Sequence, residues 1–230
     1  MDLFNYSRRE SSEVNIGATP LGGNNPIRIQ SMTNTVTMDT EACVEQAKRI
    51  IDAGGEYVRL TTQGVREAEN LKNINIGLRS QGYDTPLVAD VHFNPKVADV
   101  AAQYAEKVRI NPGNYVDPGR TFKQLEYTDE EYAAELQKIR DRFVPFLNIC
   151  KENHTAVRIG VNHGSLSDRI MSRYGDTPEG MVESCMEFLR ICVDEKFTDV
   201  VISIKASNTV VMVKTVRPVS YTHLTLPTIA

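Results

Sequence analysis

Short apolar runs typical of buried strands alternate along this chain with longer segments in which apolar residues recur every three or four positions. The expected strands cover residues 27–33, 56–62, 86–93, 106–114, 155–164 and 199–208. The expected helices cover residues 40–55, 64–82, 94–105, 128–154 and 177–197, and a further one begins at 208. Strand–helix alternation with apolar strands predicts an α/β fold, in which helices cover a parallel sheet.

Two parallel architectures fit this alternation, a doubly wound sheet and a (β/α)₈ barrel of the TIM type. The first strand-to-helix turn lacks the G-x-G-x-x-G sequence of dinucleotide-binding sheets. Polar or charged residues close nearly every predicted strand, as in barrels, whose sites are built at the carboxyl ends of many strands. About six strands are present where a closed barrel needs eight, so the pattern predicts an incomplete TIM-type barrel.

Prolines set two of the expected helix boundaries. Pro145 predicts a kink or break within residues 128–154, and Pro218 is expected to end the helix that begins at 208. The remaining segment, PVSYTHLTLPTIA, has no charge and no helical period. We therefore expect a barrel domain over residues 1–217 and a non-homologous, disordered tail over residues 218–230, left by a truncated reading frame.

Composition narrows the class of protein. The chain has 230 residues, a formal net charge of −4 and a pI of about 5.7, which argues against a nucleic-acid or anionic-membrane binder. No apolar run reaches the length of a membrane span, and the N-terminus has no apolar signal segment, so a cytoplasmic location is expected. The four cysteines form no C-x-x-C pair; we expect small buried thiols and no metal site built from them.

Cationic side chains recur near the ends of four predicted strands. They are Arg59 in YVRLTT, Arg109 in KVRINPGN, Arg158 in AVRIGVNHG and Lys205 in VVISIKASN. A cation on a core strand requires an anion, because burying it unpaired is costly. One such residue is most simply a salt bridge to a loop, but four in the same position predict a pocket for a phosphorylated ligand.

A fifth run, LVADVHF, carries Asp90 and His92 on one face of a strand, two residues apart. An acid and an imidazole at the barrel mouth can position a hydroxyl group or move a proton, and they are the candidate catalytic residues. A structural pair that fixes nearby loops is the alternative. Asn162 and Ser207 follow the third and fourth cations and suit recognition of a polyhydroxylated phosphorylated substrate.

Six stretches, read in order, resemble the barrel domain of the 4-hydroxy-3-methylbut-2-enyl diphosphate synthase family (GcpE/IspG). They are PIRIQSMTNT, GGEYVRLTT, LVADVHFNP, KVRINPGN, VRIGVNHGSL and VISIKASN, and the similarity extends from about Gly17 to Arg217. The family acts in the methylerythritol phosphate route of isoprenoid biosynthesis. The N-terminal sequence and the long segment before the fifth strand resemble the family's larger, three-domain form.

The resemblance implies reductive ring opening and dehydration of 2-C-methyl-D-erythritol 2,4-cyclodiphosphate. It implies a [4Fe–4S] cluster on a separate domain, with ferredoxin or flavodoxin as the electron donor, and a dimeric assembly in the two-domain form. It assigns diphosphate binding to six residues, Arg59, Arg109, Arg158, Lys205, Asn162 and Ser207. Asp90 and His92 are expected to face the hydroxyl-bearing carbons of the substrate.

The family's cluster cysteines match none of the cysteines in this sequence, and the iron–sulfur domain is absent from it. The resemblance therefore implies a chain that binds the diphosphate but is inactive alone. Two alternatives stay open: a dihydropteroate-synthase-like barrel that binds a diphosphate without redox chemistry, and a non-catalytic or misfolded fragment. Six strands leave open sheet edges, and open edges promote association.

Overall fold

The structure, a computed structural model, describes residues 10–118, 121–122, 124–221 and 228–229. The strands are β1 (Glu13–Val14), β2 (Leu21–Gly22), β3 (Gln30–Met32), β4 (Tyr57–Thr62), β5 (Leu87–Val91), β6 (Lys107–Ile110), β7 (Ala156–Asn162), β8 (Val200–Lys205) and β9 (Thr228–Ile229). The α-helices are α1 (Thr40–Asp52), α2 (Val65–Arg79), α3 (Pro95–Ala101), α4 (Asp129–Asn153), α5 (Asp168–Tyr174), α6 (Pro178–Asp194) and α7 (Thr209–Tyr221). Two short 3₁₀ turns, η1 (Pro112–Asn114) and η2 (His163–Ser165), follow β6 and β7.

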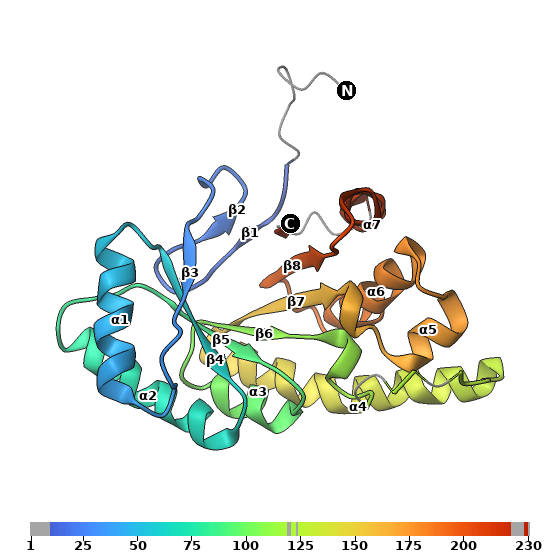
Figure 1. Ribbon diagram of the computed structural model, residues 1–230, viewed down its shortest axis with the longest axis horizontal. Helices are drawn as coiled ribbons and strands as arrows, with labels where there is room; N and C mark the ends of the chain where they lie inside the picture. The colour runs from blue at the N-terminus through green and yellow to red at the C-terminus, as the bar shows by residue number, and fades with distance from the viewer. Residues whose placement is uncertain (1–9, 119–120, 123, 222–227, 230) are drawn as a thin grey trace, which may run out of the picture.

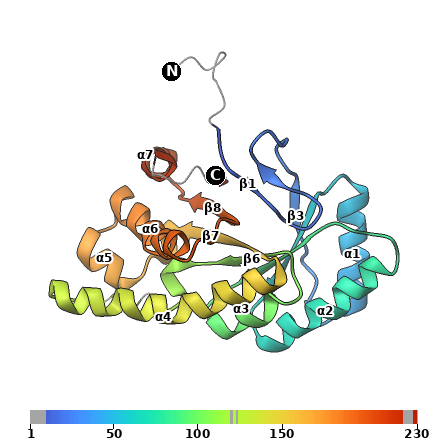
Figure 2. The same cartoon turned by 180° about the vertical axis from the view of Figure 1, so that it is seen from behind.

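Strands β3 to β9 form one sheet in chain order, and every neighbouring pair in it is parallel. The sheet curls into an open half-barrel whose outer side is covered by helices (Figures 1 and 2). This arrangement confirms the predicted α/β class and the six strands β3–β8 expected from the sequence. The helices begin where the sequence places caps: the Asp39 side chain accepts a hydrogen bond from Ala42 N, and Thr128 forms a capping box with Glu131.

Successive side chains of each strand point to opposite faces of the sheet, and the two faces have different surroundings. The residues on the outer face, such as Val58, Val108 and Ile159, belong to the main apolar core between the sheet and the helices. The residues between them point into the half-barrel, and there the charged side chains lie. The carboxyl-terminal half of this inner face is therefore the place to look for a polar site.

An antiparallel hairpin of β1 and β2 closes the other end of the half-barrel. Val14, Ile16 and Leu21 of this segment form a separate buried cluster with residues near the starts of the strands, including Tyr57 and Val201. The hairpin lies on the open side of the curved sheet, away from α2 and α3 (Figure 1). The sequence pattern missed it, because two-residue strands carry no measurable period.

Helix α4 is one continuous element of 25 residues with Pro145 inside it, so of the kink or break expected there, no break occurs. The expectation that Pro218 ends the next helix is wrong. Helix α7 does not stop before Pro218 but continues to Tyr221. Each proline removes only one backbone hydrogen bond, and packing against neighbouring elements can outweigh that loss.

The expected tail of residues 218–230 is only partly described. Residues 218–221 belong to α7, and Thr228–Ile229 pair in parallel with β8 as β9. Residues 222–227 and 230 lie outside the described residues. The described part of this segment thus contributes the end of α7 and one short strand at the edge of the sheet.

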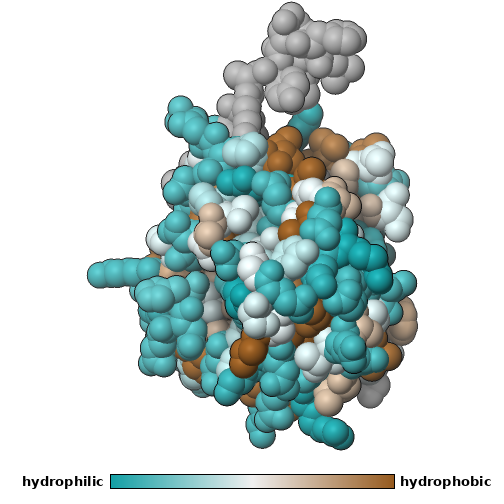
Figure 3. Space-filling model, turned by 90° about the vertical axis from the view of Figure 1, so that its left-hand side faces the viewer, coloured by the Kyte–Doolittle hydropathy of each residue, from teal (hydrophilic) through white to brown (hydrophobic). Residues whose placement is uncertain are grey.

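The remaining surface and core features match an ordinary globular domain. All four cysteines are buried and unpaired, as expected. The face that carries α1 and α2 is largely hydrophilic, with apolar residues in separate small patches (Figure 3). None of the helices in the described part of the chain is long and apolar enough to cross a membrane.

Candidate functional site

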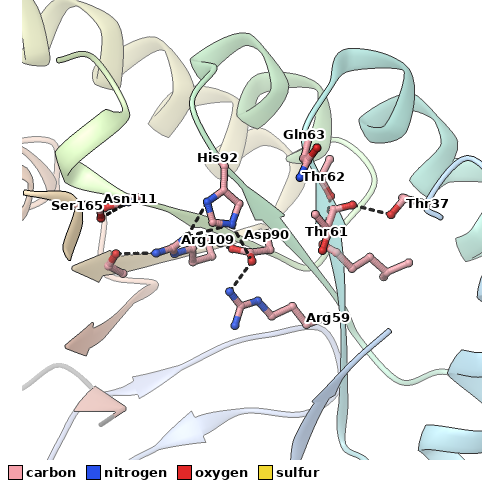
Figure 4. Close-up of polar contacts among 12 residues, drawn as sticks. Thr37, Arg59, Thr61, Thr62, Gln63, Asp90, His92, Arg109, Asn111 and Ser165 are labelled. Carbon is pink, nitrogen blue, oxygen red and sulfur yellow. Dashed lines mark hydrogen bonds and ion pairs between the residues drawn. The ribbon is translucent and has the colours of Figure 1, made fainter. Parts of the chain in front are cut away.

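Three cationic or basic side chains from three adjacent strands converge on the Asp90 carboxylate inside the half-barrel (Figure 4). Arg59 of β4 donates from its Nη2 atom to Asp90 Oδ2, and Arg109 of β6 donates from Nη1 to Oδ1 at 3.2 Å. The His92 ring follows β5, and its Nε2 atom lies 3.0 Å from Asp90 Oδ2. Asp90 is the anion that joins the other three side chains, whereas the sequence analysis expected the charge of the arginines to be balanced by a ligand.

Arg158 of β7 is the neighbour of Arg109 across the sheet, in direct register. Its Nε atom donates to Ser203 Oγ of β8 at 2.8 Å. Ser203 is buried and accepts this hydrogen bond as a neutral group. The bond therefore orients the Arg158 side chain but does not balance its positive charge. We call Arg59, Asp90, Arg109 and Arg158 the guanidinium layer.

The guanidinium layer is short of negative charge: it contains three guanidinium groups and one carboxylate. Burial, followed by the charges of Arg59 and Arg109, lowers the pKa of Arg158 to about 10. Burial also lowers the pKa of Arg109, although Asp90 opposes this. Cations with lowered pKa values in one buried cluster repel one another, and an incoming anion relieves that repulsion.

Asp90 remains ionised although it is 2% exposed. Burial by itself raises the pKa of this carboxyl. The hydrogen bond from His92 and the charges of Arg59 and Arg109 outweigh that effect and leave the pKa at about 2. Asp90 therefore acts as a fixed negative charge that orients its three partners.

The other predicted site residues lie farther along the strands. Lys205 is the last residue of β8 and is exposed, and it pairs in register with Asn162 at the end of β7. Ser207 follows in an exposed loop. Asn162 Oδ1 accepts the N–H of Gly164, so part of this amide serves the local turn. These three residues lie beyond the guanidinium layer, at the carboxyl ends of the strands. We call this edge of the half-barrel the rim, and the three residues can reach a ligand only from there.

Some residues of the site escaped the sequence analysis because they are uncharged or lie one layer deeper. Gly160 O accepts a hydrogen bond from Arg109 Nη2 at 2.9 Å, and a Cβ atom at this position would collide with the Arg109 side chain. Ser203 holds Arg158, and Lys107 lies two residues before Arg109 on the same face. The period-2 rule, applied backward from Arg109 and Lys205 and forward from Arg158, was the signal that could have found all three.

Asn111 has a structural role in this region. Its Nδ2 atom donates to Ser165 Oγ at 2.8 Å, and its Oδ1 atom accepts the N–H of Gly113. This amide ties the loop after β6 to the loop after β7, as Figure 4 shows. It fixes the rim around the guanidinium layer.

The cysteine thiols do not fit an iron–sulfur cluster. Cys43 lies on α1, Cys150 on α4, and Cys185 and Cys192 on α6, and all four are buried. Burial raises the pKa of each thiol, which disfavours the thiolate that iron requires. Within the described ranges, no group of three or more His, Cys, Asp or Glu side chains is placed to hold a metal ion.

Comparison with known proteins identifies relatives over almost the whole chain. A 4-hydroxy-3-methylbut-2-en-1-yl diphosphate synthase (flavodoxin) of Phocaeicola vulgatus is 94% identical over 217 residues, which are 94% of this chain and 35% of the relative. Proteins of the same name from Porphyromonas gingivalis and Chlorobaculum tepidum are 58% and 51% identical over 219 and 215 residues. These alignments cover 94% of this chain in both cases, but 37% and 29% of the relatives. The chain thus spans about a third of the length of the curated relatives it matches.

Solved structures with little sequence similarity share the fold. A type I 3-dehydroquinate dehydratase from Clostridium difficile superimposes with a TM-score of 0.59 at 12% identity, over 95% of this chain and 80% of that chain. A truncated 3-deoxy-D-arabino-heptulosonate 7-phosphate synthase from Thermotoga maritima gives a TM-score of 0.56 at 12% identity, over 95% and 68%. The model of the GcpE TIM-barrel domain matches residues 11–227. The chain therefore belongs to the GcpE TIM-barrel domain family, and the dihydropteroate-synthase-like alternative is not favoured.

Proposed function

We propose that this chain is the substrate-binding barrel of a 4-hydroxy-3-methylbut-2-en-1-yl diphosphate synthase and that the guanidinium layer binds the diphosphate of 2-C-methyl-D-erythritol 2,4-cyclodiphosphate. The observation that carries this proposal is the charge of the layer. Asp90 balances only one of the three guanidinium groups of Arg59, Arg109 and Arg158. A diphosphate supplies the missing negative charge, and guanidinium groups match its oxygens in geometry.

The rim residues extend this binding site toward solvent. Lys205 would add a point charge and Asn162 and Ser207 neutral donors, because all three lie at the carboxyl ends of β7 and β8. Each charge-assisted hydrogen bond contributes roughly 1.5–3 kcal/mol. A few such bonds suffice for micromolar affinity, which corresponds to about 8 kcal/mol.

Asp90 and His92 would act on the carbon skeleton of the substrate. The His92 side chain is partly exposed at the mouth, and its Nε2 atom lies against Asp90 Oδ2. From this position His92 can donate a proton to the departing hydroxyl group and recover it from solvent. Asp90, which stays ionised, fixes the orientation of the ring.

The redox part of the reaction would require residues outside the described chain, because the thiols here do not fit the family's [4Fe–4S] cluster. We therefore propose that this chain alone binds the cyclodiphosphate without reducing it. For the whole protein we propose flavodoxin, named in the relatives, or ferredoxin as the electron donor. A cytoplasmic location and a homodimer complete this proposal.

Isothermal titration of the chain with the cyclodiphosphate tests the assignment. Arg158→Met should weaken binding by at least about tenfold, since it removes a charge-assisted contact worth 1.5–3 kcal/mol. Arg190→Met is the matched control, because Arg190 lies on the outer helix α6, paired with Glu183. Equal affinity in all three proteins would refute the site. Absence of binding in the native chain, with aggregation, would favour a non-catalytic fragment.

A further inference from the structure

Lys107 is the first residue of β6 and is fully buried inside the half-barrel. It lies two residues before Arg109, so it occupies the layer directly beneath the guanidinium layer. Its Nζ atom has no hydrogen-bond partner among the described residues. A buried ammonium group without an acceptor is costly, and the usual response is loss of the charge.

Among the residues that the structure describes, none near the amine offers a counter-ion. Its Nζ atom lies 4.2 Å above the centre of the Tyr57 ring from β4, and the Tyr57 hydroxyl donates its proton to Thr19 O. Burial raises the pKa of this phenol to about 12, so it remains neutral. The hairpin, β7 and β8 contribute only apolar side chains to this layer, among them Val14 and Val201.

The charged groups that face the amine belong to the guanidinium layer, and most of them are cations. Arg59 on β4, Arg109 on β6 and Arg158 on β7 are positive, and Asp90 on β5 is already shared between two of them. Burial, followed by the charges of Arg158 and Arg59, lowers the pKa of Lys107 to about 7. The contact with the aromatic ring favours the ammonium form but does not offset these effects.

We propose that Lys107 is uncharged in the ligand-free protein above neutral pH and takes up a proton from solvent when a diphosphate binds to the guanidinium layer. Anion binding and protonation of this amine are then linked, with one neutral amine becoming one ammonium ion. The proposal rests on the proposed function of the guanidinium layer as a diphosphate site. It assigns to Lys107 a positioning role, since the amine supports the ligand's charge from below without touching it.

The size of the linkage follows from the strand geometry. A ligand seated on the guanidinium layer lies about 7 Å from the amine, the rise of two residues along a strand. At an effective dielectric constant of about 20, one negative charge at this distance raises the pKa of an amine by roughly 1.5–2 units. A diphosphate carries more than one charge, so Lys107 should be mostly protonated in the complex at pH 8.

The test is isothermal titration of the full chain with inorganic pyrophosphate at pH 8, in buffers with different ionisation enthalpies. The buffer dependence of the heat gives the number of protons exchanged on binding. Pyrophosphate exchanges protons itself, so the informative quantity is the difference between the native chain and Lys107→Met. Lys72→Met is the matched control, because Lys72 is an exposed lysine of α2. The native chain and the control should take up about 0.5–1 proton more than Lys107→Met.

If pyrophosphate binds but the native chain and Lys107→Met take up the same number of protons, the inference about Lys107 is overturned and the diphosphate site stands. If pyrophosphate does not bind, both the inference and the diphosphate site are overturned. If Lys107→Met fails to fold, NMR of the native chain with ¹³Cε-labelled lysine gives the same answer. One lysine signal should titrate near pH 7 in the free chain and at least one unit higher with pyrophosphate. A free chain in which every lysine titrates above pH 9 overturns the inference.

Discussion

Replacement of Asp90 by asparagine removes one negative charge from the guanidinium layer and keeps the shape of the side chain. Asp90 is 2% exposed and is shared by Arg59, Arg109 and His92. The substitution therefore leaves two guanidinium groups close together without their carboxylate. Loss of one partner from a buried ion pair typically costs about 3–5 kcal/mol, so Asp90→Asn should lower the free energy of unfolding by that amount at pH 7.

The lowered pKa of Asp90 gives a separate value for the contribution of its ionised form to the free energy of unfolding. Its folded-state value of about 2 lies below the unfolded value of 3.8, so the ionised carboxylate contributes stability above pH 4. That contribution is about 2 kcal/mol, and about half of it is lost when the pH falls to 3. The difference in stability between native Asp90 and Asp90→Asn should therefore shrink by about 1 kcal/mol between pH 5 and pH 3.

Urea denaturation at pH 7, 5 and 3 measures both effects on one pair of proteins. Asp84→Asn is the matched control, because Asp84 is an exposed carboxylate in the loop before β5. The control should change stability by less than about 0.5 kcal/mol at every pH. If Asp90→Asn is as stable as the native chain, or if its deficit does not depend on pH, Asp90 is not the anion that holds the guanidinium layer.

Three further substitutions separate binding from stability. Gly160→Ala should displace Arg109 and weaken cyclodiphosphate binding about tenfold. Gly164→Ala in the next loop should bind normally, as calorimetry would show, because its Cβ atom would meet only Asn162 Oδ1 at an ordinary contact distance of 3.9 Å. Arg169→Met should cost about 3–5 kcal/mol in urea denaturation with unchanged ligand affinity, because it breaks the buried ion pairs that join α5 to Asp117 and to Glu187 of α6. Lys107→Met should raise stability by about 3–5 kcal/mol at pH 6, since the folded-state pKa near 7 lies below the unfolded value of 10.5. That gain should disappear as the pH approaches 10.5, and a gain that persists there would contradict the lowered pKa.

The fold was largely predictable because each strand and helix carries its own period. Runs such as YVRLTT and VVISIK are apolar on one face, and their outward residues enter the core beneath the helices. The predicted helix end at Pro218 was wrong and no break occurs at Pro145, because tertiary packing decides whether a helix continues through a proline. The β1–β2 hairpin had no local signal, and its stability comes from contacts with strands that follow later in the chain.

The residues of the site that could be predicted from the sequence are the charged ones. Arg59, Asp90 and Arg109 stand out in apolar strands, and parallel pairing brings them together. From the sequence we expected a ligand to supply all the negative charge that balances the arginines. The pairing of Asp90 with two arginines on neighbouring strands depends on the register of those strands, and local sequence patterns do not contain the register. Lys107 escaped notice for the same reason: its burial depends on the hairpin and on Tyr57.

A crystal structure of the chain with 2-C-methyl-D-erythritol 2,4-cyclodiphosphate tests the central claim most directly. The account predicts phosphate oxygens within hydrogen-bonding distance of Arg109 and Arg158, with the sugar carbons toward His92. Diphosphate density elsewhere, with the guanidinium layer unchanged and free of ligand, would contradict it.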